Sequence, residues 1–253
     1  MNLCVDVGNT LIKFGVFNNN ELIEKFVIPS KENYSTEQYV GVFKEHYLGQ
    51  IKNICYSSVA TRVNMSLTKA LKKAYGCNIL IINKDIKSDL DFEIDDKDEL
   101  GSDLLAALVS TKERHGYPAI IADLGTATKF LILDKEGKFI SCFILPGMDS
   151  SVNSLFSNTS LLPEIKLVKP DKFFAKNTFE AINNGIVFSQ ATSLVGMAEK
   201  IEKELGYTCL KYITGGYSKL VIDEVKSTYT LDKELVLYGL NLLLEKNARK
   251  IYE

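Results

Sequence analysis

The sequence predicts an α/β fold with mixed sheets, in which the second half restarts the plan of the first. Short apolar runs typical of buried strands alternate along the 253 residues with segments whose apolar residues have helical spacing. One pattern occurs twice: an apolar strand, an Asp-x-Gly turn with small polar residues and threonine, and a returning strand. It begins at Asp6 and again at Asp123. This is an internal repeat of architecture rather than of close sequence.

The composition indicates a globular protein and argues against several functional classes. Hydrophobic residues make up 46% and charged residues 25%, and the net charge of −2 lacks the basic excess of nucleic-acid-binding proteins. The five cysteines stand far apart without a C-x-x-C pair, which favours a reducing cytosol over a disulfide framework or a zinc site. Asp6 interrupts the N-terminal apolar run early, so we expect neither a signal peptide nor a membrane span.

Strand and helix signals alternate through the first half of the chain. A strand over residues 2–5 and a returning strand over 11–17 form a hairpin around the turn Gly8-Asn9-Thr10. Ser35-Thr-Glu-Gln38 has the pattern of a capping box ahead of a helix. The other expected elements are a strand over 21–28, the capped helix to about 47, a strand over 51–59, a helix over 62–75, a strand over 77–82, an acidic loop over 84–99 and a helix that ends near 115.

Gly116-Tyr117-Pro118 ends that helix, because proline disfavours the helical conformation in the preceding residue. We place a domain boundary there and expect domains over 1–116 and 117–234, with the C-terminal segment 235–253 packing back on the first. The second half is expected to contain strands over 119–122, 129–133 and 138–145, a helix opened by Pro146-Gly147, a long helix over 178–205, a strand over 212–214, a helix from about 218 and a closing helix over 235–247.

The tip of the first hairpin gathers groups that can hold a metal–phosphate unit. It combines the carboxylate of Asp6, the backbone N–H groups and hydroxyl of Gly8-Asn9-Thr10, and the ammonium of Lys13. The related turn at Asp123 would grip a nucleotide phosphate chain from the other side. The alternative is a pair of ordinary polar hairpin turns, since motifs this short also occur by chance.

Several short motifs follow one another over almost the whole chain, and their order and spacing are jointly specific although each is weak alone. They are Asp6-x-Gly-Asn-Thr-x-x-Lys, Leu-Gly-x-Asp103, Asp123-x-Gly-Thr-Ala-Thr, Pro146-Gly147, Asn177-Thr178, Thr214-Gly-Gly216 and Leu237-x-Gly239-Leu. With these motifs the chain resembles the type III pantothenate kinases.

The resemblance implies both a fold and an activity. The fold is that of the acetate/sugar kinase–Hsp70–actin superfamily, with two RNase H-like (actin-like ATPase) domains whose mixed sheets are flanked by helices. The activity is ATP-dependent phosphorylation of the primary hydroxyl of pantothenate, the first step toward coenzyme A. The family also implies a cytoplasmic homodimer that needs Mg²⁺ or another divalent metal and a monovalent cation, K⁺ or NH₄⁺.

On this resemblance, Asp103 is the general base. Phosphoryl transfer needs a group that takes the acceptor's proton as the new bond forms, and a carboxylate can do so. The sequence alone also allows Asp103 to be a helix N-cap, after Gly-Ser and before an Ala/Leu run. Asp6 would hold Mg²⁺ directly or through water, and Thr10 and Lys13 would face the phosphates. A solvent-facing Lys13 is the alternative.

Five further positions match ligand contacts of the family. Asp123 matches the monovalent-cation ligand, and Thr126 matches a residue that contacts ATP. Thr178 matches a substrate contact, and Gly215 and Gly216 match the glycine turn on the adenosine side. The alternatives are a polar turn for the first two, a helix cap for Thr178 and an ordinary strand-to-helix connection for the glycines.

The chain departs from the family around the acceptor segment Gly101-Ser102-Asp103-Leu104. The family usually has arginine after the base, which suits a bidentate grip on a carboxylate, and here Leu104 follows it. The family usually has tyrosine where this chain has Ile94. Ser141-Cys142 stands where Gly-Gly is common, and Thr128-Lys129-Phe130-Leu131 stands where Thr-Thr-Phe-Asp is often found.

The phosphate side therefore matches the family, and the acceptor side differs. Three hypotheses follow: an active pantothenate kinase with a diverged acceptor pocket, a kinase of another small hydroxyl compound, and a nucleotide-binding regulatory relative with little catalysis. We favour the first, because a silent relative has no need to keep a base at Asp103.

Overall fold

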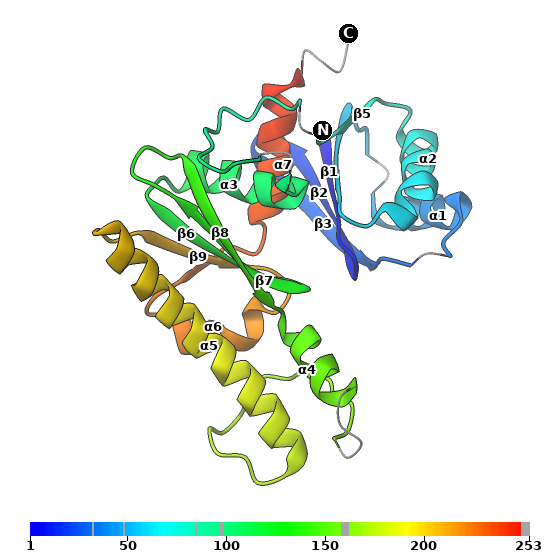
Figure 1. Ribbon diagram of the computed structural model, residues 1–253. Helices are drawn as coiled ribbons and strands as arrows, with labels where there is room; N and C mark the ends of the chain where they lie inside the picture. The colour runs from blue at the N-terminus through cyan, green and yellow to red at the C-terminus, as the bar shows by residue number, and fades with distance from the viewer. Residues whose placement is uncertain (32, 48, 84, 97–98, 158–161, 249–253) are drawn as a thin grey trace. The chain divides into compact units, whose positions relative to one another are not determined.

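The chain forms two compact units in the computed structural model (Figure 1), which describes residues 1–31, 33–47, 49–83, 85–96, 99–157 and 162–248. The first unit comprises Met1–Leu90, Ile94–His115 and Glu234–Glu253. The second comprises Asp91–Glu93 and Gly116–Lys233.

A five-stranded mixed sheet forms the centre of the first unit. Its strands are β1 (Asn2–Val7), β2 (Leu11–Asn18), β3 (Glu21–Pro29), β4 (Asn53–Ser58) and β5 (Ile79–Ile81), in the order β3-β2-β1-β4-β5. The first three strands pair antiparallel, whereas β4 runs parallel to β1 and β5 runs parallel to β4. Successive residues of a strand point to opposite faces, so Asp6 lies on the face opposite to Val5 and Val7.

Helices pack on both faces of this sheet. The helices α1 (Thr36–His46) and α2 (Asn64–Tyr75) share a buried core with Val5, Phe14 and Val16, and the short 3₁₀ helix η1 (Thr61–Val63) precedes α2. The opposite face carries α7 (Leu235–Lys246), which contacts β1, β2 and β4. Beside α7 lies α3 (Ser102–Arg114), as Figure 1 shows.

Gly239 explains one motif of the sequence by packing rather than by chemistry. A Cβ atom at Gly239 would lie 1.9 Å from the carbonyl oxygen of Ala106, so only glycine lets α7 approach the backbone of α3 this closely. The Leu237-x-Gly239 motif therefore fixes the helix pair that covers the Asp6 face of the sheet.

The second unit repeats the topology of the first. Its strands are β6 (Ala119–Leu124), β7 (Ala127–Leu133), β8 (Phe139–Pro146), β9 (Leu210–Thr214) and β10 (Thr230–Leu231). The order is β10-β9-β6-β7-β8, with β6, β7 and β8 antiparallel and β9 and β10 parallel to β6. This is the order of the first sheet with β6 in the place of β1, so the predicted repeat of architecture is present.

Three helices build the core of the second unit on one face of its sheet. They are α4 (Met148–Ser157), α5 (Thr178–Leu205) and α6 (Ser218–Val225), and Figure 1 shows α5 lying along the sheet. Ala122, Leu124 and Phe130 share a buried cluster with residues of these helices. Asp123 and Lys129 alternate with these apolar residues and therefore lie on the other face.

The local signals of the sequence predicted several elements closely. The helix expected over 178–205 has these bounds in α5. The capping box also forms: Gln38 N donates to Ser35 Oγ over 3.2 Å, and Ser35 N donates to Gln38 Oε1 over 2.8 Å. In the described part of the chain, no helix combines the length and the apolar character that crossing a membrane requires.

The structure differs from the expectation at several strands; β6 reaches Leu124 and β7 begins at Ala127, where strands over 119–122 and 129–133 were expected. β1 does not end at Asp6 but continues to Val7, because Asp6 pairs with residues of both neighbouring strands. The short strand β10 was not predicted, since two residues carry no periodic signal.

Candidate active site

The first hairpin places an aspartate and a lysine side by side. Asp6 on β1 lies directly opposite Lys13 on β2, so both side chains leave the same face of the sheet, and Lys13 Nζ lies 3.5 Å from Asp6 Oδ2. A hydrogen bond from Gly8 N to the carbonyl oxygen of Leu11, 3.0 Å long, closes the turn. The predicted phosphate-binding residues of this hairpin therefore share one tip, with Asn9 and Thr10 exposed between the strands.

A buried serine connects this tip to the start of α3. Ser57 on β4 is the parallel partner of Asp6 and is fully buried. Its Oγ lies 2.7 Å from Ser102 Oγ, and one hydroxyl donates to the other. Because Asp103 follows Ser102, the candidate base lies at the same end of the first sheet as the Asp6–Lys13 pair.

The N-terminus of α3 shows how Asp103 is held. The N-cap is Gly101, and Asp103 lies inside the first turn, so the alternative interpretation of Asp103 as the N-cap is wrong. A Cβ atom at Gly101 would lie 2.6 Å from Asp103 Oδ1. The carboxylate therefore bends back over the backbone of Gly101 and occupies the space that any side chain there would need.

The two residues that depart from the family lie at different depths. Leu104 is buried, with 8% of its surface exposed, and so it offers little surface to a ligand. Ile94 is half-buried. The structure assigns Leu104 to packing in the first unit, which is compatible with an apolar residue at this position.

Arg62, which the sequence analysis did not single out, also reaches the first hairpin. Its guanidinium donates from Nη2 to the carbonyl oxygen of Asn9 over 2.7 Å, from the 3₁₀ helix that follows β4. The planar guanidinium suits phosphate oxygens. Together with Lys13, Arg62 brings a second cationic side chain to the predicted phosphate tip.

The second hairpin repeats the arrangement of the first. Asp123 on β6 lies directly opposite Lys129 on β7, and Lys129 Nζ lies 3.7 Å from Asp123 Oδ2. The parallel partner of Asp123 on β9 is Thr214, which is buried. Burial raises the pKa of the Cys142 thiol on β8. The charge of Lys129 lowers this pKa and that of Asp123 raises it, so both charged groups influence Cys142.

Three turns crowd together at the Asp123 end of the second sheet. Gly125 N donates to the carbonyl oxygen of Ala127 over 3.1 Å, which repeats the bond at Gly8. A Cβ atom at Gly147 would lie 2.3 Å from the carbonyl oxygen of Thr126, and one at Gly215 would lie 2.4 Å from that of Leu124. The backbone of Thr126 thereby lies against the start of α4, and that of Leu124 lies against the turn after β9.

Gly216 differs from its neighbour because it faces open space. Apart from Gly216 and its two chain neighbours, no described residue has an atom within 4 Å of the position that its Cβ would take, whereas Gly215 has φ +92° and is crowded. Tyr217 follows, and its hydroxyl donates a short hydrogen bond to Asp149 Oδ2 of α4. Burial and the neighbouring Asp149 carboxylate raise the pKa of Tyr217. An open backbone at Gly216 fits the predicted close approach of a nucleotide.

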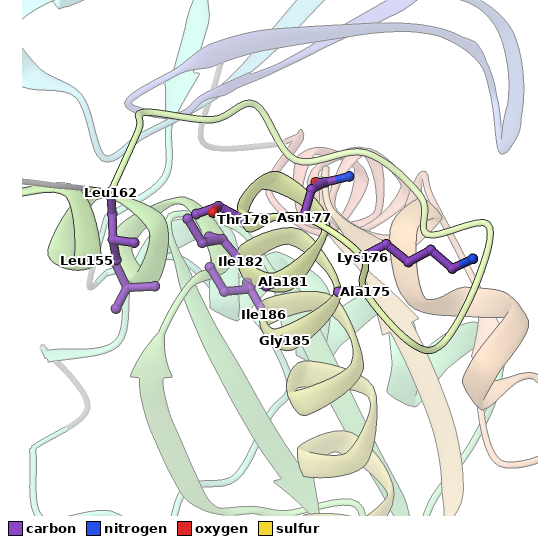
Figure 2. A pocket seen from close by; sticks show the side chains of 10 residues that line it. All are labelled: Leu155, Leu162, Ala175, Lys176, Asn177, Thr178, Ala181, Ile182, Gly185 and Ile186. Atoms are coloured by element: carbon purple, nitrogen blue, oxygen red, sulfur yellow. The ribbon is translucent and has the colours of Figure 1, made fainter.

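Thr178 lies on the wall of a cavity of about 600 Å³ in the second unit (Figure 2). The N-cap of α5 is Asn177, whose Oδ1 accepts from Glu180 N over 2.9 Å, so the helix-cap interpretation of Thr178 is wrong. Leu155 and Leu162 face Ile182 across the cavity, while Lys176 points away from them. The hydroxyl of Thr178 therefore supplies a polar group at the edge of an apolar wall.

The acidic residues fit a divalent metal that arrives with phosphate, because Mg²⁺ commonly uses one or two carboxylates together with substrate phosphates. Asp6 offers such a carboxylate at the phosphate tip. Among the described residues, no group of three His, Cys, Asp or Glu side chains could hold a metal by itself. A monovalent cation at Asp123 fits less well, because the carboxylate already faces Lys129.

Solved structures of known proteins share this fold. A conserved protein of Campylobacter jejuni, proposed to be a Baf family transcriptional activator, has a TM-score of 0.59 and 19% identity, with coverage of 98% of this chain and 99% of that chain. Component A of (R)-2-hydroxyglutaryl-CoA dehydratase from Acidaminococcus fermentans has a TM-score of 0.55 and 11% identity, with coverage of 100% and 99%. The predicted fold class, RNase H-like (actin-like ATPase) with two mixed sheets flanked by helices, is confirmed.

Sequence comparison identifies the family. The model of the type III pantothenate kinases matches residues 2–200. A curated type III pantothenate kinase of Moorella thermoacetica is 29% identical over 254 residues, which cover 98% of this chain and 100% of the relative. This chain belongs to the type III pantothenate kinase family.

Proposed function

We propose that this protein transfers the γ-phosphoryl group of ATP to the primary hydroxyl of pantothenate, the first step toward coenzyme A. Family membership supports this activity. The structural observation that carries it is the hydrogen bond between Ser57 and Ser102, 2.7 Å long, because it joins the start of α3 to the strand beside Asp6. The candidate base Asp103 and the candidate phosphate-binding tip therefore belong to the same unit and lie at the same end of its sheet.

The residues of the first unit divide the reaction between them. Lys13 and the exposed backbone of the Gly8–Thr10 turn would hold the phosphates, and Arg62 stands beside them. Asp6 would hold Mg²⁺ together with the phosphates, and the metal would supply positive charge for the oxygens of the transferred group. Asp103 accepts the proton of the acceptor hydroxyl as its oxygen bonds to the γ-phosphorus, while the bond from that phosphorus to ADP breaks.

We further propose that the cavity at Thr178 holds part of the acceptor. Its apolar wall, which includes Leu155 and Leu162, suits the aliphatic part of pantothenate, and the Thr178 hydroxyl can hydrogen-bond an amide or a hydroxyl group. On the nucleotide side we propose that Thr126 and Gly216 contact ATP, because the turns that carry them are fixed by backbone crowding.

The family implies ATP and a divalent metal as cofactors. We propose a homodimer in the cytoplasm, and we propose that the two compact units correspond to the domains expected over 1–116 with 235–253 and over 117–234. The requirement for potassium or ammonium that the family implies at Asp123 is a separate question, because Lys129 faces this carboxylate.

Measurement of ADP release by the purified protein tests the function. With ATP, Mg²⁺ and pantothenate we expect turnover, and Asp103→Asn is expected to lower kcat by about 10²–10⁴-fold while ATP still binds. The matched control is Asp95→Asn, which removes an exposed acidic charge of the same unit and should keep wild-type kcat. Turnover only with another hydroxyl compound would redirect the acceptor assignment. ATP binding without turnover on any acceptor would contradict the kinase assignment.

A further inference from the structure

We infer that the ammonium group of Lys129 takes the place of a monovalent cation at Asp123, so that this kinase works without potassium or ammonium. The activity measurement that tests this inference rests on the proposed function, whereas the cation-binding measurement does not. Its structural basis is the ion pair between Lys129 Nζ and Asp123 Oδ2, 3.7 Å apart, on adjacent strands of the second sheet.

The backbone fixes this ion pair more firmly than a surface pair. Asp123 and Lys129 are direct cross-strand partners, so both Cβ atoms leave the same face of the β6–β7 hairpin at a set distance. The two side chains are only 15% and 20% exposed. A carboxylate with so little access to water needs a compensating positive charge, and Lys129 supplies it from within the chain.

A second ion pair of the same unit, outside the sheet strands, differs from this one in exposure. Lys138 and Glu93 also form an ion pair in the second unit, with 2.8 Å between Nζ and Oε2, but their side chains are 31% and 62% exposed. Water and dissolved ions can screen that pair freely. At Asp123 a dissolved monovalent cation would have to displace the Lys129 ammonium, which has the same charge. The ammonium also stays near the carboxylate because it is part of the chain.

The first unit explains why the same logic does not remove Mg²⁺ from Asp6. Lys13 faces Asp6 with Nζ 3.5 Å from Oδ2, in the arrangement that Lys129 repeats. A divalent metal arrives with phosphates, whose negative charges attract Lys13 away from the carboxylate. A monovalent cation at Asp123 carries only the single charge that the Lys129 ammonium already supplies, so the ammonium would repel it without a gain in charge at the carboxylate.

The test compares salts at constant ionic strength. ADP release by wild-type protein with ATP, Mg²⁺ and pantothenate is measured in choline chloride, in KCl and in NH₄Cl. We expect rates that agree within about twofold. Lys129→Thr removes the built-in charge and is expected to lose more than tenfold in choline chloride and to recover in KCl. The control Lys138→Thr, which removes a lysine of the same unit whose partner Glu93 is exposed, should behave as wild type. A wild-type rate that rises tenfold or more in KCl overturns the inference.

A binding measurement keeps the test independent of turnover. Thallium(I), a substitute for potassium, is titrated against each protein and followed by ²⁰⁵Tl NMR. We expect saturable binding by Lys129→Thr and none by wild-type protein. Saturable binding of thallium(I) by the wild type overturns the inference, whether or not the protein turns over any acceptor. Missing turnover on every acceptor would contradict only the proposed kinase activity. Lys129→Gln, which keeps a long side chain, replaces Lys129→Thr if the threonine variant does not fold.

Discussion

The hydroxyl oxygens of Ser57 and Ser102 lie 2.7 Å apart, and this contact ties the end of a central strand to the first turn of α3. Ser57 is fully buried and pairs with Asp6 in the parallel ladder. A buried hydroxyl is costly to leave without a partner, so the contact also fixes the rotation of the helix start. The position of Asp103 relative to Asp6 therefore depends on this pair of serines.

Ser57→Ala is expected to lower kcat several-fold and to change the KM for ATP little. The substitution leaves the Ser102 hydroxyl without this partner, which costs about 1–3 kcal/mol of stability and loosens the helix start that carries Asp103. Steady-state kinetics and urea unfolding measure the two effects separately.

Ser110→Ala provides the matched control for this prediction. Ser110 is also buried in α3, and its Oγ accepts a hydrogen bond from Arg114 rather than from the strand. The control should lose a similar amount of stability and keep wild-type kcat. If both variants lowered kcat equally, the effect would come from general destabilisation, and the positioning role of Ser57 would be excluded. The double variant Ser57→Ala/Ser102→Ala should fall less than the sum of the single effects.

Gly101→Ala is expected to reduce kcat at least tenfold without unfolding the protein. The new Cβ would lie 2.6 Å from Asp103 Oδ1, so the carboxylate must rotate away from its present position. Misplacement of a base by about 1 Å can cost on the order of 10²-fold in rate. Single-turnover kinetics measure the chemical step directly, and ATP affinity should stay within twofold of wild type.

Gly41→Ala is the control, since no atom lies within 4 Å of the Cβ position in this helical glycine. It should stabilise the protein by up to about 1 kcal/mol and leave the rate unchanged. A normal single-turnover rate in Gly101→Ala would show that the observed position of the carboxylate is not the one that catalysis needs.

Local signals were enough to predict much of the fold. The capping box at Ser35, the boundaries of α5 and the two Asp-x-Gly hairpins all arise from residues close together in sequence. The motif at Gly239 could be found but not explained, because its cause is the backbone of Ala106 on a distant helix.

The candidate site was less accessible to sequence reasoning, because its contacts join distant segments. Ser57 has no motif of its own, and only the register of β4 against β1 reveals that it faces Asp6. Arg62 reaches Asn9 across 53 positions of sequence. Lys129 was visible as a departure from the family, but its pairing with Asp123 required the hairpin register. Ile94 and Leu104 remain predictions as substrate contacts, and the burial of Leu104 favours packing.

The ion pair of Glu202 and Lys211 is expected to make the second unit sensitive to acid. Burial raises the pKa of Glu202, but the hydrogen bonds from Lys211 and from the backbone N–H of Cys209 outweigh it, and the net pKa is lowered. A carboxyl with a lowered folded-state pKa stabilises the fold fully above its ordinary value of 4.5. That contribution is lost as the pH falls through the folded-state pKa, below 4.5.

Glu202→Gln should therefore lower the free energy of unfolding by about 1 kcal/mol at pH 7, and the difference from wild type should shrink toward zero as the pH falls from 5 to 3. Urea unfolding at a series of pH values measures this. Glu93→Gln is the control, because its ion pair with Lys138 is exposed and should contribute little at any pH. A difference between Glu202→Gln and wild type that stayed constant down to pH 3 would show that the charge of Glu202 is not what stabilises the unit.

Gly216→Ala is expected to weaken ATP binding about tenfold and to leave stability unchanged. Beyond the neighbouring residues in the chain, no described residue has an atom within 4 Å of the new Cβ, so a loss of affinity is expected to come from contact with the nucleotide itself. Gly215→Ala is the contrasting variant. Its Cβ would lie 2.4 Å from the carbonyl oxygen of Leu124, and its φ of +92° strains a residue with a side chain, so it should destabilise the protein by about 1–3 kcal/mol or more. Isothermal titration with a non-hydrolysable ATP analogue and urea unfolding separate the two effects. Unchanged ATP affinity in a stable Gly216→Ala protein would contradict the proposed contact between the nucleotide and this turn.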